Sequence, residues 1–163
     1  MSKQTNAQAI NNALIAMGFQ EMSRLMVIAQ SGVETGMGSY GKAASVNNFF
    51  NITAGHFWTG PTLDGPDTDG AGNPIIQKWR AYPSISEGVK DYVAFLSMPR
   101  YVHSKAALMA GDVEGFARML RGEGYYTFPV DDFIDPKTGQ KRAGYLNMLR
   151  GQVGLAKQLL GMP

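Results

Sequence analysis

The chain has 163 residues, of which 44% are hydrophobic and 17% charged, a composition typical of one folded domain with a buried core. The net charge is only +2 and no dense run of Lys and Arg is present, which argues against nucleic-acid binding. The absence of cysteine excludes disulfides and thiolate chemistry, and the two histidines, His56 and His103, are not spaced as a ligand pair, so we expect no metal and no other cofactor.

Hydrophobic residues recur at three- and four-residue spacings along six segments, and this spacing predicts helices. The segments are residues 5–17, 20–33, 84–96, 101–109, 112–121 and 145–160. Ser84 is followed by Glu87 at the spacing of a capping box, and Asp112 is a suitable N-cap. The helical segments therefore account for most of the predicted core.

A small β lobe is expected at residues 47–82, between the second and third predicted helices. Residues 75–82 have the composition of a strand, and residues 46–52 fit a turn followed by a strand. Residues 60–74 are rich in Gly, Pro and Asp, which predicts an irregular loop at the tip of the lobe. Residues 122–144 are also expected to be irregular. The whole chain, residues 1–163, is predicted to be a single α+β domain that is predominantly helical.

Glu34 stands at the end of the second predicted helix, directly before Gly36 and Gly38. A carboxyl group at this place can lie in the dry wall of a cleft, where burial would raise its pKa and suit it to act as a general acid. The alternative is a solvated residue in the last turn of the helix. The C-terminal end of a helix favours positive charge, so a glutamate there is electrostatically unfavourable for the helix. A residue kept in an unfavourable place slightly favours the functional interpretation of Glu34.

A second carboxylate is sought in the predicted loop, which contains Asp64, Asp67 and Asp69. Two carboxyl groups in different environments can divide the acid and base roles of glycoside hydrolysis. The alternative for each of the three is simple turn formation. Aromatic residues gather in the same region and suit either sugar stacking or the core of the lobe. Trp79 is expected in the core, and Trp58 is expected to be exposed.

Five motifs, taken in order, resemble those of glycoside hydrolase family 73, the β-N-acetylglucosaminidases of bacterial cell walls, phage lysins and the flagellar rod hydrolase. They are residues 34–38 (ETGMG), 47–50 (NNFF), 58–61 (WTGP), 79–82 (WRAY) and 124–127 (GYYT). The resemblance covers residues 20–160. Three features depart from the family pattern: Met37 replaces an aromatic residue, Asn51 replaces a glycine, and residues 128–144 form an insertion that either lengthens the cleft or serves a partner.

The resemblance implies a lysozyme-like helical body with a small β-hairpin lobe across a cleft. It implies hydrolysis of peptidoglycan glycan strands with Glu34 as general acid and Tyr125 close to the cleaved sugar. Residues assigned to sugar binding are Asn48, Phe49, Trp58, Tyr82 and Tyr126. Either Asp64, Asp67 or Asp69 activates water, or the acetamido group of the substrate itself attacks.

Other functions stay open at this point: a muramidase or lytic transglycosylase acting on the same glycan, or a wall-binding or virion module without catalysis. We expect a monomer that does not insert into membranes, because no stretch is apolar enough to span one. The N-terminal residues have no signal-peptide pattern. The expectation is therefore synthesis in the cytoplasm and action on the bacterial cell wall after release, export or virion delivery.

Overall fold

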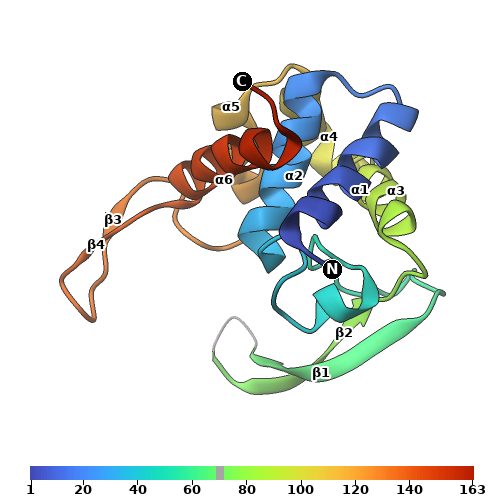
Figure 1. Ribbon diagram of the computed structural model, residues 1–163. Helices are drawn as coiled ribbons and strands as arrows, with labels where there is room; N and C mark the ends of the chain where they lie inside the picture. The colour runs from blue at the N-terminus through green and yellow to red at the C-terminus, as the bar shows by residue number, and fades with distance from the viewer. Residues whose placement is uncertain (69–71) are drawn as a thin grey trace.

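A computed structural model describes residues 1–68 and 72–163 of the chain, and it shows a helical body with a β-hairpin beneath it (Figure 1). The helices are α1 (Lys3–Ala16), α2 (Glu21–Thr35), α3 (Ile85–Phe95), α4 (Val102–Met109), α5 (Val113–Gly122) and α6 (Tyr145–Leu160), with short 3₁₀ turns η1 (Ala43–Val46) and η2 (Pro99–Tyr101). The strands are β1 (Thr62–Thr68), β2 (Pro74–Arg80), β3 (Phe133–Ile134) and β4 (Lys141–Arg142).

Helix α2 runs through the middle of the body and packs against α1, α4 and α6 (Figure 1). Five consecutive residues of α2, from Leu25 to Ala29, each expose 1% or less of their surface. A helix that is buried all round lies in the core rather than at its edge. Ser31 and Thr35 at the end of α2 are also buried, so the last turn is enclosed on one side by neighbouring segments.

The hairpin β1–β2 forms the β lobe, with Thr62 paired to Arg80 and Thr68 paired to Pro74 in antiparallel register. The expectation of an irregular segment over residues 60–74 was wrong for Thr62–Thr68, which is a strand. Most of β1 is exposed, so it lacks the alternating hydrophobic pattern that would have identified it.

The strand expected within residues 46–52 is also absent: η1 is followed by turns, in which Asn47 and Asn51 adopt left-handed backbone angles. Asparagine tolerates this conformation better than most residues other than glycine. Asn51 can therefore stand where the family has glycine.

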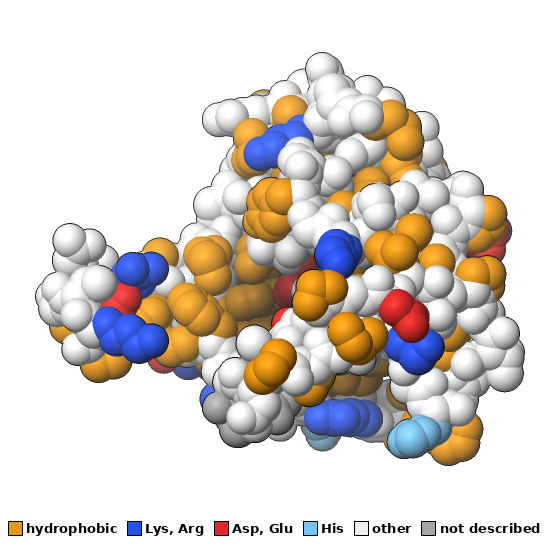
Figure 2. Space-filling view, turned by 90° about the horizontal axis from the view of Figure 1, so that it is seen from below, with side chains coloured by type: hydrophobic (Ala, Val, Ile, Leu, Met, Phe, Trp, Pro, Cys, Tyr) orange, Lys and Arg blue, Asp and Glu red, His pale blue; other side chains and the backbone are white. Residues whose placement is uncertain are grey.

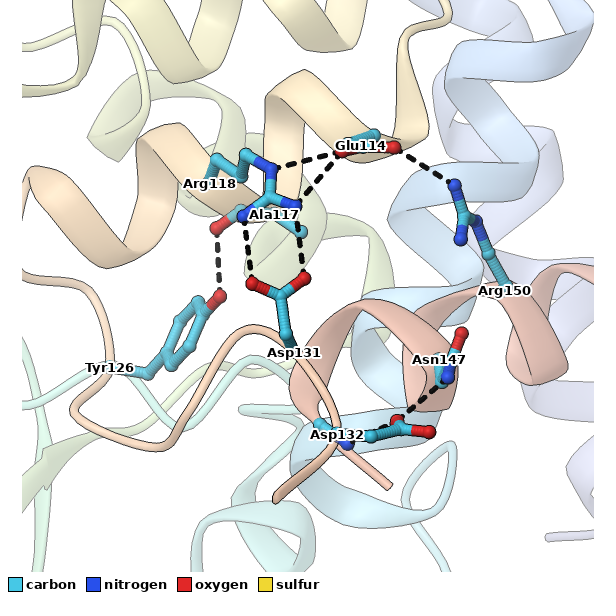
Figure 3. Close-up of polar contacts among 9 residues, drawn as sticks. Glu114, Ala117, Arg118, Tyr126, Asp131, Asp132, Asn147 and Arg150 are labelled. Atoms are coloured by element: carbon cyan, nitrogen blue, oxygen red, sulfur yellow. Dashed lines mark hydrogen bonds and ion pairs between the residues drawn. The ribbon is translucent and has the colours of Figure 1, made fainter. Parts of the chain in front are cut away.

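The insertion at residues 128–144 contains the short hairpin β3–β4, which projects from the side of the body (Figure 1). Its base is tied to two helices by polar contacts (Figure 3). Arg118 of α5 donates two hydrogen bonds to the carboxylate of Asp131, and Asp132 accepts from the Asn147 amide of α6. These contacts fix the entry into α6.

The predominantly helical α+β fold with a hairpin lobe is confirmed, and the helix ends agree with the predictions within two residues. The predicted caps are also present: the Ser84 and Asp112 side chains accept hydrogen bonds from backbone N–H groups three residues ahead. Over the described ranges, none of the helices is long and apolar enough to cross a membrane.

Candidate active site

The position of Glu34 follows from the way α2 ends. Gly36 adopts φ +57°, a left-handed angle that glycine reaches without strain, and its N–H donates to the Gly32 carbonyl at 3.0 Å. The Thr35 hydroxyl lies 2.9 Å from the Phe49 carbonyl and accepts from the Gly38 N–H. The turn after the helix is thereby fastened to the following segment, and Glu34 is held in the last turn.

Glu34 is partly buried, and burial raises the pKa of its carboxyl group from the ordinary value of 4.5 to about 7. The Tyr145 hydroxyl donates a hydrogen bond to Glu34 Oε1 at 2.9 Å, which acts in the opposite direction and lowers the pKa. Burial has the larger effect. A substantial fraction of Glu34 is thus protonated near neutral pH and able to give up its proton, as a general acid requires.

Tyr145 was not singled out by the sequence analysis, yet it is the residue that contacts the Glu34 carboxyl group. It begins α6, and its ring is stacked on Tyr126 with centroids 3.7 Å apart. Tyr126, to which sugar binding was assigned, donates its hydroxyl to the Ala117 carbonyl of α5 at 2.7 Å (Figure 3). In this structure Tyr126 therefore supports Tyr145, and through it Glu34.

A cavity of about 410 Å³ lies beside Glu34. It is lined by Glu34, Phe50, Asn51, Ile52, Thr53, Gly55, Phe57, Arg80, Phe95, Met98, Arg100, Tyr101, Gly124 and Tyr125. The face seen from below is hollowed, with hydrophobic and acidic side chains in the hollow (Figure 2). Tyr125 lies in this wall, and its hydroxyl donates to the Phe50 carbonyl at 2.6 Å. Glu34 and Tyr125 are thus brought to one cavity.

Asn48 and Phe49 lie in the protein interior and do not line this cavity. The Asn48 side chain is fully buried, donates to the carbonyls of Ile52 and Arg80, and accepts from the Ile52 N–H. Phe49 exposes only 3% of its surface and belongs to the hydrophobic core. In this structure Asn48 joins the segment after η1 to strand β2.

Trp58 and Tyr82 line a separate pocket of about 490 Å³. Trp58 is partly buried rather than exposed, because its ring packs on the Arg80 guanidinium and its N–H donates to the Pro61 carbonyl. The Arg80 Cζ atom lies 4.7 Å from the centre of the Trp58 ring. Tyr82 donates its hydroxyl to Asp91, which also forms an ion pair with Arg80 at 2.9 Å. Both aromatic residues pack around the Arg80–Asp91 pair.

The described carboxylates of the hairpin do not line the Glu34 cavity. Asp64 forms an exposed ion pair with Lys78 at 2.8 Å, and Asp67 accepts from the Thr68 N–H. Asp69, the third candidate, lies outside the described residues. Among the residues that the structure describes, Glu34 is the one carboxylate that lines this cavity, and no group of three or more acidic or His side chains could hold a metal ion.

Comparison with known proteins gives one family. The family described as "mannosyl-glycoprotein endo-beta-N-acetylglucosaminidase" (Glucosaminidase) matches residues 10–150. The peptidoglycan hydrolase FlgJ of Escherichia coli K12 is 30% identical over 112 residues, which are 64% of this chain and 35% of FlgJ. The chain thus spans about a third of the length of these curated relatives.

Solved structures of similar fold cover nearly the whole chain. A peptidoglycan hydrolase mutant from Sphingomonas sp. A1 is 26% identical and has a TM-score of 0.66, with 97% of this chain and 98% of that one covered. The glycoside hydrolase domain of Salmonella typhimurium FlgJ is 24% identical and has a TM-score of 0.63, with 99% and 92% covered. The latter likeness concerns the fold.

Proposed function

The chain belongs to the glucosaminidase family, and from this premise we propose that it hydrolyses the glycan strands of peptidoglycan as an endo-β-N-acetylglucosaminidase. The observation that carries the proposal is Glu34, whose pKa is raised to about 7 in the wall of a cavity that it shares with Tyr125. The proposal is further supported by similar proteins named as peptidoglycan hydrolases.

The first step is protonation of the leaving group. Glu34 donates its proton to the glycosidic oxygen while the bond from that oxygen to the anomeric carbon breaks. The hydrogen bond from Tyr145 then stabilises the carboxylate that forms, since a donor favours the charged state of its acceptor. Tyr145 would therefore act on the reaction through Glu34.

For the nucleophile we propose the acetamido group of the substrate. Its carbonyl oxygen attacks the anomeric carbon as the glycosidic bond breaks, and water then opens the cyclic intermediate while returning a proton to Glu34. This route needs no second carboxylate, which agrees with the absence of Asp64 and Asp67 from the cavity lining. Asp69→Asn tests it, because a loss of kcat in that variant would assign the role to Asp69 instead.

Tyr125 is suited to orient the acetamido group. A hydroxyl has one donor and two acceptor positions, and the Tyr125 donor is occupied by the Phe50 carbonyl. The remaining acceptor positions of its oxygen can receive the acetamide N–H. The carbonyl of that amide would then point away from Tyr125 and toward the anomeric carbon.

We extend the proposal to the setting of the reaction: a monomer acting on the bacterial wall outside the cytoplasmic membrane, with the bacteriolytic activity of a phage endolysin. Loss of turbidity of a wall suspension measures lysis, and light scattering of the purified protein measures its mass.

The deciding experiment is mass spectrometry of the fragments released from purified peptidoglycan by the wild type and by Glu34→Gln. Reducing N-acetylglucosamine ends from the wild type, and none from a folded Glu34→Gln variant, are expected. Reducing or anhydro muramic acid ends would identify a muramidase or a lytic transglycosylase. Binding without any cleavage by the folded wild type would identify a wall-binding or structural module.

A further inference from the structure

The cavity beside Glu34 is lined by an arginine that forms no ion pair with any carboxylate that the structure describes. Arg100, in η2, is exposed and lines the same cavity as Glu34 and Tyr125. Its Nε donates to the Glu123 carbonyl at 2.6 Å, and its guanidinium lies 5.6 Å from the centre of the Tyr101 ring. Within residues 1–68 and 72–163, Arg100 forms no ion pair.

The neighbouring charged groups are already engaged. Arg80, the other arginine of the cavity, donates to both carboxylate oxygens of Asp91. The carboxylate of Glu123 accepts from the backbone N–H groups of His103 and Ser104 at the start of α4, and it forms no ion pair with Arg100 among the described residues. The positive charge of Arg100 is therefore directed at whatever occupies the cavity.

The Arg100 guanidinium is also held in place. Gly124 adopts φ +79°, and a Cβ atom at that position would lie 2.2 Å from Arg100 Nη2. A side chain at residue 124 would therefore displace the guanidinium. With Nε bonded to a carbonyl and one edge against Gly124, the group loses little further freedom when it binds a ligand.

We propose that Arg100 binds a carboxylate of the substrate beside the cleaved bond and so makes the site selective for peptidoglycan over uncharged glycans. This inference rests on the proposed function. A glycan of N-acetylglucosamine alone carries no carboxylate, whereas muramic acid carries a lactyl group with either a free carboxylate or a peptide. A guanidinium recognises such a group through charge-assisted hydrogen bonds, which are about twice as strong as neutral ones.

The test measures equilibrium binding in the Glu34→Gln background, so that cleavage does not interfere. The probes are soluble peptidoglycan glycan strands and the same strands with their carboxylates chemically reduced to alcohols. Arg100→Gln is expected to weaken binding of the native strands roughly tenfold and to leave binding of the reduced strands unchanged. Arg100→Lys keeps the charge but not the planar guanidinium, so its affinity for the native strands is expected to lie between those of the unsubstituted Arg100 protein and Arg100→Gln.

Arg150→Gln is the matched control, because Arg150 is an exposed arginine of α6 that pairs with Glu114 and does not line the cavity. Arg150→Gln removes the same charge and should leave the affinity for native strands and the affinity for reduced strands unchanged. An equal loss on native and reduced strands with Arg100→Gln, or a similar loss on native strands with Arg150→Gln, would refute the proposal.

A third probe separates the two sources of the carboxylate. Strands stripped of peptide by an amidase keep only lactyl carboxylates. An Arg100 effect that persists on them assigns the lactyl group, and an effect confined to intact strands assigns the peptide. Cleavage by the unmutated protein is measured in parallel. Carboxylate-dependent binding without cleavage would overturn the proposed function and leave the Arg100 inference standing.

Discussion

The raised pKa of Glu34 has a consequence for stability that a single substitution can measure. The unfolded chain has the ordinary pKa of 4.5 at this residue, and the folded protein has about 7. Folding therefore disfavours the ionised carboxyl group, and the cost grows as the pH rises from 4.5 to 7 and is complete above 7. At about 1.4 kcal/mol for each pH unit, the cost is on the order of 3 kcal/mol.

Glu34→Gln removes this cost because the amide does not ionise, while its oxygen can still accept the Tyr145 hydroxyl. The variant is expected to have a free energy of unfolding on the order of 3 kcal/mol above wild type at about pH 8 and nearly equal to it at about pH 4. Urea denaturation of both proteins across this range measures the difference, since all other titrating groups cancel. A difference independent of pH, or a variant less stable at pH 8, would refute the reasoning.

Three further results are expected. Tyr145→Phe removes the donor that lowers the Glu34 pKa, so the pH at which kcat/KM falls by half should move upward from its position near 7, and an unmoved or lowered midpoint would contradict the assignment. Asn48→Ala removes three side-chain hydrogen bonds and leaves the Ile52 N–H without its acceptor, although the Ile52 carbonyl still accepts from the Arg80 N–H. Urea denaturation should therefore show a loss on the order of 3 kcal/mol with an unchanged KM, and a raised KM at unchanged stability would restore the role in sugar binding. Asp64→Asn breaks only an exposed ion pair, so stability should change by less than about 1 kcal/mol and kcat should not change, whereas a large loss of kcat would make Asp64 the second acid.

The helices could be predicted because their signals are local. Helix α6 was predicted with both ends correct, since its apolar residues recur at helical spacing up to Gly161, which ends the helix with a left-handed angle. Ser84 and Asp112 identified two helix starts for the same reason. Strand β1 could not be found this way, because it is defined by pairing with β2 and buries little of its own surface.

The site was only partly predictable. Glu34 stood out by its place at a helix end before glycine, and the motif resemblance supplied Tyr125. Tyr145 lies 111 residues from Glu34 in the chain, and the short insertion hairpin separates it from the other motifs. A tyrosine at the start of a final helix has no sequence pattern that distinguishes it from a core residue. Tyr145 is a core residue, since it exposes only 2% of its surface, and it is also the hydrogen-bond donor to Glu34.

The sugar-binding surface is hard to assign from aromatic residues for a related reason. An aromatic ring suits a sugar, a cation and a hydrophobic core equally well, so the sequence does not say which it faces. Trp58 covers the Arg80 guanidinium, while its neighbour Phe57 is fully exposed and lines the Glu34 cavity. Only the fold shows that these two adjacent rings line different pockets.

The departures from the family pattern are also explained by what holds the acid in place. The insertion does not disturb Glu34, because its base is anchored before the chain enters α6: Asp131 is held by Arg118, and the Tyr145 N–H donates to the Pro129 carbonyl. The chain can therefore lengthen beyond residue 131 without moving the Tyr145 hydroxyl away from the carboxyl group. The general acid and an added surface hairpin can therefore coexist, because these anchors lie between them.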